Sequence, residues 1–79
     1  MPTHAFILIE TAVGKTKDVV SALRAVVGVI AVDAVAGPYD VIATVETQDL
    51  SGVGDVVTGQ IHTVNGIVRT VTCLSLSAP

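Results

Sequence analysis

The sequence predicts a single α+β domain in which a four-stranded antiparallel sheet carries two helices on one face. Three observations predict this fold class. Four short segments are rich in apolar and β-branched residues, two segments between them have apolar residues at helical spacing, and glycine, proline and polar residues separate the segments. Because 79 residues are enough for one core only, we assign residues 1–79 to one domain.

The first half of the chain is expected to supply a strand, a helix and a second strand. Residues Ala5 to Thr11 form a short apolar run, typical of a strand that is buried on both faces. From Lys15 onward the apolar residues follow the spacing of an amphipathic helix, and Gly28 is expected to end it. Residues Val29 to Ala36 then predict the second strand.

A turn and a third strand are expected next. The Gly-Pro-Tyr-Asp cluster at residues 37–40 is typical of a tight turn between two strands. The following residues, Val41 to Thr47, alternate in polarity as a strand with two different faces does. One face is expected to carry Val41, Ala43 and Val45, and the other Ile42, Thr44 and Glu46.

The last part of the chain predicts a second helix and a fourth strand. Asp49 is placed to cap the helix, whose apolar stripe consists of Val53, Val56, Val57 and Ile61. Each glycine within it costs about 1 kcal/mol relative to alanine, so tertiary packing must hold this helix. Asn65-Gly66 is expected to end it, Ile67 to Leu76 to form the strand, and Ser77 to Pro79 to fray. The resulting βαββαβ order is ferredoxin-like.

Charge and hydropathy exclude several classes of protein. The net charge is −3 and the cations Lys15, Lys17, Arg24 and Arg69 are scattered, so direct nucleic-acid binding is not expected. The longest apolar stretch, Ala25 to Ala36, is shorter than the roughly 20 residues of a membrane span. The N-terminus lacks a secretory pattern and the chain has one cysteine, so we expect a cytoplasmic protein without membrane contact.

The apolar content predicts self-association. The chain is 51% hydrophobic and only 14% charged, whereas globular proteins have about 25% charged residues. The first strand offers Phe6 and Leu8 on one side and Ile7 and Ile9 on the other, so neither face of the sheet suits water. A second copy of the chain is the simplest way to cover the apolar residues of an exposed face. We therefore expect two-fold dimers, packed sheet to sheet or edge to edge, and higher rings.

Neither a metal site nor a catalytic site is expected, and no cofactor. His4 and His62 have no second ligand at metal-binding spacing. His4 is most simply a partly exposed residue at a strand end, although a general base is the alternative. Cys73 lies in the fourth strand without a conspicuous basic neighbour other than Arg69, so we expect a buried, inert thiol.

The acid that follows the predicted turn is the best candidate for ligand binding. Asp40 comes directly after residues 37–39, where glycine allows close approach of a backbone and an acid can accept from a ligand amine. Asp40 closing its own turn is an equally good interpretation. In the last strand, Thr70 and Thr72 are expected to present two hydroxyls on one face, with Arg69 on the other.

Together these segments resemble the effector-binding RAM domain of the Lrp/AsnC (feast/famine) transcription regulators, over nearly the whole chain. The ordered set, with the turn at residues 37–40, carries the resemblance. Its segments are Ile7-Leu8-Ile9-Glu10-Thr11, Gly14-Lys15, Ala22-Leu23, Val27-Gly28-Val29, Ala34-Val35-Ala36-Gly37-Pro38-Tyr39-Asp40, Asp49-Leu50 and Gly66-Ile67-Val68-Arg69-Thr70-Val71-Thr72.

The resemblance implies ferredoxin-fold dimers that assemble into octamer-like or decamer-like rings and bind amino acids between dimers, near the turn. Its site residues are then Gly37, Pro38, Tyr39 and Asp40, with Thr70 and Thr72 as neighbours. Full-length members carry a DNA-binding helix-turn-helix, and we expect this chain to be the stand-alone form. Two alternatives stay open: a small enzyme of the dimeric α+β barrel type, and a structural partner that co-assembles with a full-length regulator.

Overall fold

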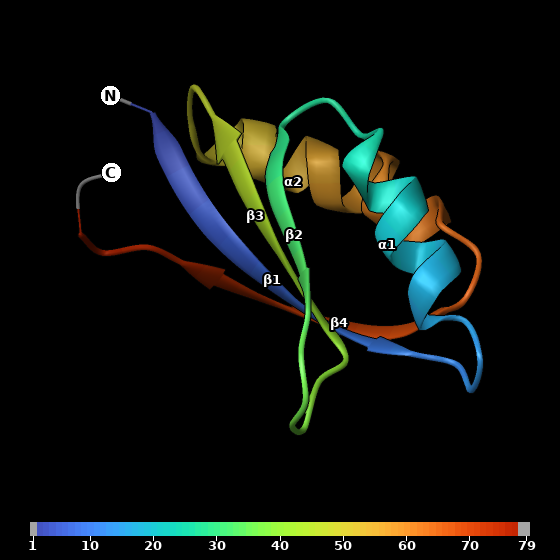
Figure 1. Ribbon diagram of the computed structural model, residues 1–79. Helices are drawn as coiled ribbons and strands as arrows, with labels where there is room; N and C mark the ends of the chain where they lie inside the picture. The colour runs from blue at the N-terminus through green and yellow to red at the C-terminus, as the bar shows by residue number, and fades with distance from the viewer. Residues whose placement is uncertain (1, 78–79) are drawn as a thin grey trace.

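The computed structural model describes residues 2–77 and confirms the ferredoxin-like βαββαβ arrangement. Within these residues the strands form one antiparallel sheet in the order β2-β3-β1-β4, and both helices cover the same face of it (Figure 1). The elements are β1 (Thr3–Thr11), α1 (Thr16–Arg24), β2 (Val29–Ala34), β3 (Val41–Thr47), α2 (Leu50–Gly59), the 3₁₀ helix η1 (Ile61–Thr63) and β4 (Ile67–Leu74).

Both helices end earlier than predicted: α2 ends at Gly59 and is followed by the separate helix η1, although Asn65-Gly66 was expected to end it, and α1 ends before Gly28. The helix stops at Arg24, four residues before Gly28, although Val26 and Val27 continue the apolar pattern. The N–H groups of Ala25 and Val26 bond carbonyls three residues earlier, so the chain leaves the helix through tight turns. Gly28, with φ of +99°, then turns the chain into β2 instead of ending the helix.

Smaller differences occur at the strand ends. β1 begins at Thr3 instead of Ala5, while β2 and β4 each end two residues earlier than expected. Of the tail that we expected to fray, Ala78 and Pro79 lie outside the described residues. None of the helices in residues 2–77 is long and apolar enough to cross a membrane.

The core lies between the helices and the covered face of the sheet. The alternation predicted for β3 is confirmed, because Val41, Ala43 and Val45 are buried. Each helix contributes one stripe of buried apolar residues. In α1 these are Val19 and Leu23, and in α2 they are Val53 and Val57. The buried apolar residues are Ala5, Ile7, Ile9, Val19, Leu23, Val32, Val41, Ala43, Val45, Val53, Val57 and Ile61.

The opposite face of the sheet carries no helix. The strand register pairs Phe6 with Thr44 and with Cys73, and directly paired residues point to the same side of a sheet. We call this side the open face, and it has an apolar centre with polar ends. Its residues are His4, Phe6, Leu8 and Glu10 of β1, Ile42, Thr44 and Glu46 of β3, Ala31 and Asp33 of β2, and Arg69, Val71 and Cys73 of β4.

One prediction about this face is wrong. Cys73 was expected to be a buried thiol, yet it is exposed. The physical reason is its place on β4, which forms one edge of the sheet and directs Cys73 away from the helices. Burial of a strand residue requires a covering layer as well as a strand, and this chain alone supplies a layer on one side only.

Candidate functional site

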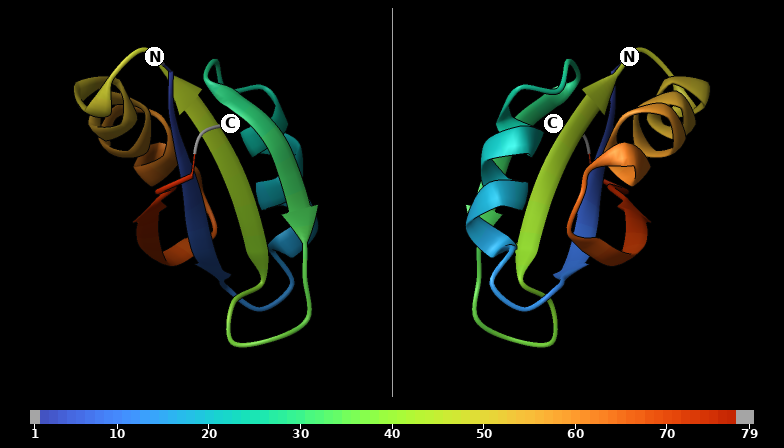
Figure 2. Two further views of the ribbon diagram at one scale, coloured as in Figure 1. Left: turned by 90° about the vertical axis from the view of Figure 1, so that its left-hand side faces the viewer. Right: turned by 90° about the vertical axis from the view of Figure 1, so that its right-hand side faces the viewer.

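The connection between β2 and β3 is a loop of residues 35–40 that projects past the rest of the molecule (Figure 2). It is longer than the predicted tight turn. The N–H of Val35 donates to the carbonyl of Asp40 at 2.9 Å, which closes the base of the loop. Gly37 and Pro38 are exposed beyond this base, and Gly37 has φ of +156°, which side chains other than glycine rarely adopt.

Asp40 fastens this loop to the end of β1. Its backbone N–H donates to the carbonyl of Ile9 at 2.9 Å, and its carboxylate oxygen Oδ2 accepts from the N–H of Thr11 at 2.8 Å. The carboxylate therefore bonds backbone, as one of the two interpretations expected, but the backbone belongs to the neighbouring strand and not to its own turn. Acceptance from a ligand amine stays a prediction.

Tyr39 brings Arg69 of β4 to the same loop. The guanidinium carbon Cζ of Arg69 lies 5.7 Å from the centroid of the Tyr39 ring, within the range of a cation–π contact. Arg69 is also the cross-strand partner of Glu10 at this end of the open face. We call Glu10, Tyr39, Asp40 and Arg69 the loop cluster. It combines two carboxylates, one guanidinium and one aromatic ring at the rim of the open face.

Thr70 and Thr72 lie on the other side of the sheet. The register pairs them with Ile9 and Ile7, which face the helices, so the two hydroxyls share one face and Arg69 lies on the other, as predicted. The structure therefore does not bring these threonines into the loop cluster of the same chain. The Oγ1 atom of Thr70 instead lies 3.0 Å from Nε2 of His62.

The contact between His62 and Thr70 was not predicted from the sequence. His62 stands in η1, and the Asn65-Gly66 turn returns the chain so that this side chain faces β4. The one sequence signal for this contact is the position of His62 shortly before the Asn65-Gly66 turn and β4. A shallow pocket of about 380 Å³ lies here, lined by His62, Ile67, Val68, Arg69 and Thr70.

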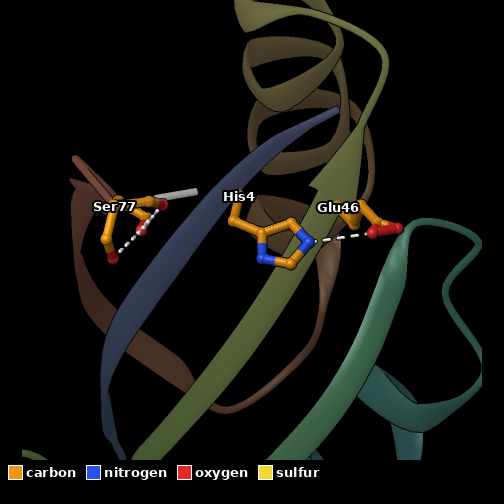
Figure 3. Close-up of polar contacts among 4 residues, drawn as sticks. His4, Glu46 and Ser77 are labelled. Atoms are coloured by element: carbon orange, nitrogen blue, oxygen red, sulfur yellow. Dashed lines mark hydrogen bonds and ion pairs between the residues drawn. The ribbon is translucent and has the colours of Figure 1, made fainter. Parts of the chain in front are cut away.

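His4 and Glu46 form a polar pair at the end of the open face opposite the loop cluster. Nε2 of His4 lies 2.8 Å from Oε2 of Glu46, its direct partner across the β1–β3 ladder (Figure 3). His4 is partly exposed at a strand end, as expected. Within residues 2–77, no group of three or more His, Cys, Asp and Glu side chains is arranged to hold a metal ion.

Comparison with known proteins identifies the family. The family model of the Lrp/AsnC ligand binding domain matches residues 4–79. The chain is 34% identical to the protein TTHA0845 of Thermus thermophilus, covering 98% of this chain and 96% of that chain with a TM-score of 0.91. It is 35% identical to the hypothetical protein PHS023 of Pyrococcus horikoshii, covering 99% and 93% with a TM-score of 0.87.

A feast or famine regulatory protein of Mycobacterium tuberculosis, solved in complex with L-methionine, shares the fold. It is 21% identical with a TM-score of 0.81, and the match covers 96% of this chain and 51% of the regulator, so the chain spans about half its length. A search of curated proteins finds no match. The family match over residues 4–79 and the two relatives above 30% identity together show that this chain belongs to the Lrp/AsnC ligand-binding domain family.

Proposed function

We propose that this chain is a stand-alone, amino-acid-sensing oligomer that binds its effector at the loop cluster, between dimers. The observation that carries the proposal is that the Asp40 carboxylate is fixed on the N–H of Thr11 while the guanidinium of Arg69 lies over the ring of the adjacent Tyr39, because an amino acid presents an ammonium and a carboxylate. The regulator that binds L-methionine supports the ligand class through its similar fold. The two relatives matched over nearly their whole length support the stand-alone form.

The hydrogen bond that Asp40 already makes indicates how an amino acid would be oriented in the site. Oδ2 of Asp40 holds the N–H of Thr11, so the other carboxylate oxygen receives the effector's ammonium group. The effector's carboxylate is bound by backbone N–H groups of the loop, and Arg69 adds a cation beside them. Thr70 and Thr72 face the helix side of their own sheet, so they reach an effector only as residues of a neighbouring copy.

The open face supplies the reason for oligomers. Phe6 is 40% exposed there, and Leu8, Ile42 and Val71 are only partly buried. Covering apolar surface yields about 25 cal/mol per Å², so this side of the sheet favours a partner. A second copy offers the same apolar centre about a two-fold axis. The loop cluster lies at the rim of this face, and this position supports binding of the effector at a seam between copies.

Calorimetric titration with each of the twenty amino acids tests the proposal. At least one is expected to release or absorb heat with the wild type, and Asp40→Asn is expected to abolish that signal because it removes the charge that meets the ammonium. The matched control is Asp55→Asn, an exposed acid on α2 away from the loop cluster. A folded wild-type sample that gives no heat with any amino acid rejects ligand sensing.

A further inference from the structure

Glu10 is a carboxylate of the loop cluster that the proposed binding of an effector leaves unused. It stands on the open face near the end of β1 and is partly buried. Arg69 is its direct partner across the ladder to β4, yet the guanidinium of Arg69 lies over the ring of Tyr39. Among the described residues the only ion pair is that of His4 with Glu46, so no cation in this part of the chain pairs with Glu10.

Asp40 lies next to Glu10 because it bonds the backbone of both residues that flank Glu10 in β1. Its N–H donates to the carbonyl of Ile9 at 2.9 Å, and its Oδ2 accepts from the N–H of Thr11 at 2.8 Å. Like charges close together on adjacent strands are destabilising. With the single guanidinium of Arg69, the two carboxylates leave the loop cluster with one negative charge in excess.

The strand order β3-β1-β4 puts Glu10 between the two groups that we assign to the effector's ammonium and carboxylate. Asp40 directly precedes β3 and Arg69 belongs to β4, on either side of β1. Because the α-carbon of an amino acid lies between its ammonium and its carboxylate, the effector's side chain begins near Glu10. The charge of that side chain then determines whether Glu10 attracts or repels the effector.

We propose that the effector of this chain is a basic amino acid, such as lysine, whose side-chain cation pairs with the Glu10 carboxylate. This inference rests on the proposed function and adds the chemical class of the effector to it. A basic amino acid carries one net positive charge, which balances the loop cluster, whereas a neutral amino acid leaves Glu10 unpaired. An acidic amino acid brings a further carboxylate to the site, so Glu10 also discriminates against acidic effectors.

Calorimetric titration with lysine and with norleucine measures the attraction. Norleucine has a straight side chain like that of lysine but lacks the terminal ammonium group. Lysine is expected to bind the wild type about tenfold more tightly than norleucine, the change that one charge-assisted hydrogen bond contributes. Glu10→Gln keeps the size of the side chain and the backbone bonds but removes the charge, so the preference for lysine is expected to fall below about twofold.

Asp55→Asn is the matched control for the total charge of the chain. It also removes one negative charge, but from an exposed position of α2 away from the loop cluster. This variant is expected to keep the preference of about tenfold for lysine over norleucine. A preference that falls equally in Glu10→Gln and Asp55→Asn would reflect the net charge of the chain, and it overturns the role of Glu10.

Titration with glutamate and with glutamine measures the repulsion on the same samples. The wild type is expected to bind glutamine more tightly than glutamate, and Glu10→Gln is expected to reduce this difference. Equal affinities of the wild type for lysine and norleucine overturn the inference of a basic effector and leave the proposed function intact. If no amino acid gives heat with the folded wild type, the proposed function fails and this inference fails with it.

Discussion

The carboxylate of Asp40 holds the N–H of Thr11 at 2.8 Å, and this bond joins the β2–β3 loop to the end of β1 across 29 positions of sequence. The loop is therefore positioned by the strand that also forms the centre of the sheet. A carboxylate that is already fixed loses little freedom when it binds a ligand, which favours affinity. The same residue has a structural role and, in our proposal, a binding role.

Two substitutions of Asp40 separate these roles. Asp40→Asn keeps an oxygen that accepts from Thr11, so it is expected to change the free energy of unfolding by less than about 1 kcal/mol while amino-acid binding is lost. Asp40→Ala removes the acceptor and is expected to cost about 1–3 kcal/mol as well. Urea unfolding and calorimetry on both variants measure the two effects. Equal amino-acid affinity of Asp40→Asn and the wild type contradicts the assigned role.

The contact between Tyr39 and Arg69 predicts a graded response. Tyr39→Phe keeps a ring under the guanidinium and is expected to keep amino-acid affinity, whereas Tyr39→Leu loses the cation–π contact and weakens it. An exposed contact of this kind contributes about 0.5–1 kcal/mol, which corresponds to roughly a two- to fivefold change in the dissociation constant. Calorimetric titration of the two variants side by side makes the measurement. Identical affinities would show that the ring plays no part.

Neighbouring residues on opposite faces of β1 predict opposite outcomes. Ile7 is fully buried beneath the helices, so Ile7→Ala is expected to cost about 2–5 kcal/mol of unfolding free energy. Leu8 lies on the open face, and Leu8→Ser is expected to leave the folded protomer intact but reduce the sedimentation mass. Far-UV circular dichroism confirms folding in each case. A mass unchanged by Leu8→Ser means that the open face is not an interface.

The glycines of α2 provide a test of the helix itself. A Cβ at Gly52 would lie 2.8 Å from Cβ of Thr47, so Gly52→Ala is expected to be destabilising. Gly54 has nothing within 4 Å of that position, and Gly54→Ala is expected to stabilise the protein by about 1 kcal/mol. Thermal unfolding of the two variants gives the comparison. A lower melting temperature for Gly54→Ala contradicts this account of α2.

The predictions from sequence succeeded where one periodic pattern decides the structure. The two-residue period of Val41–Thr47 gave both the bounds and the faces of β3, and Asp49 caps α2 through a 2.9 Å bond from the N–H of Gly52. They failed where apolar character has two explanations. Val26 and Val27 fit the stripe of α1, but they lie in the turns that lead to β2, and Val27 is 91% exposed.

The candidate site was only partly predictable. The acid at Asp40 was identified from its turn, but its bond to Thr11 depends on the pairing of strands distant in sequence. Thr70 was grouped with Asp40, yet strand register places its side chain on the helix side, against His62. Burial of Cys73 was wrong because strand composition does not reveal which strand forms the sheet edge.

The central claim is that the uncovered apolar side of the sheet requires further copies of the chain, whose seams hold the effector. Sedimentation equilibrium at micromolar protein tests it most directly. We expect species that are whole multiples of 8.0 kDa, at least dimers, with no appreciable protomer. A single 8.0 kDa species across that concentration range contradicts the account.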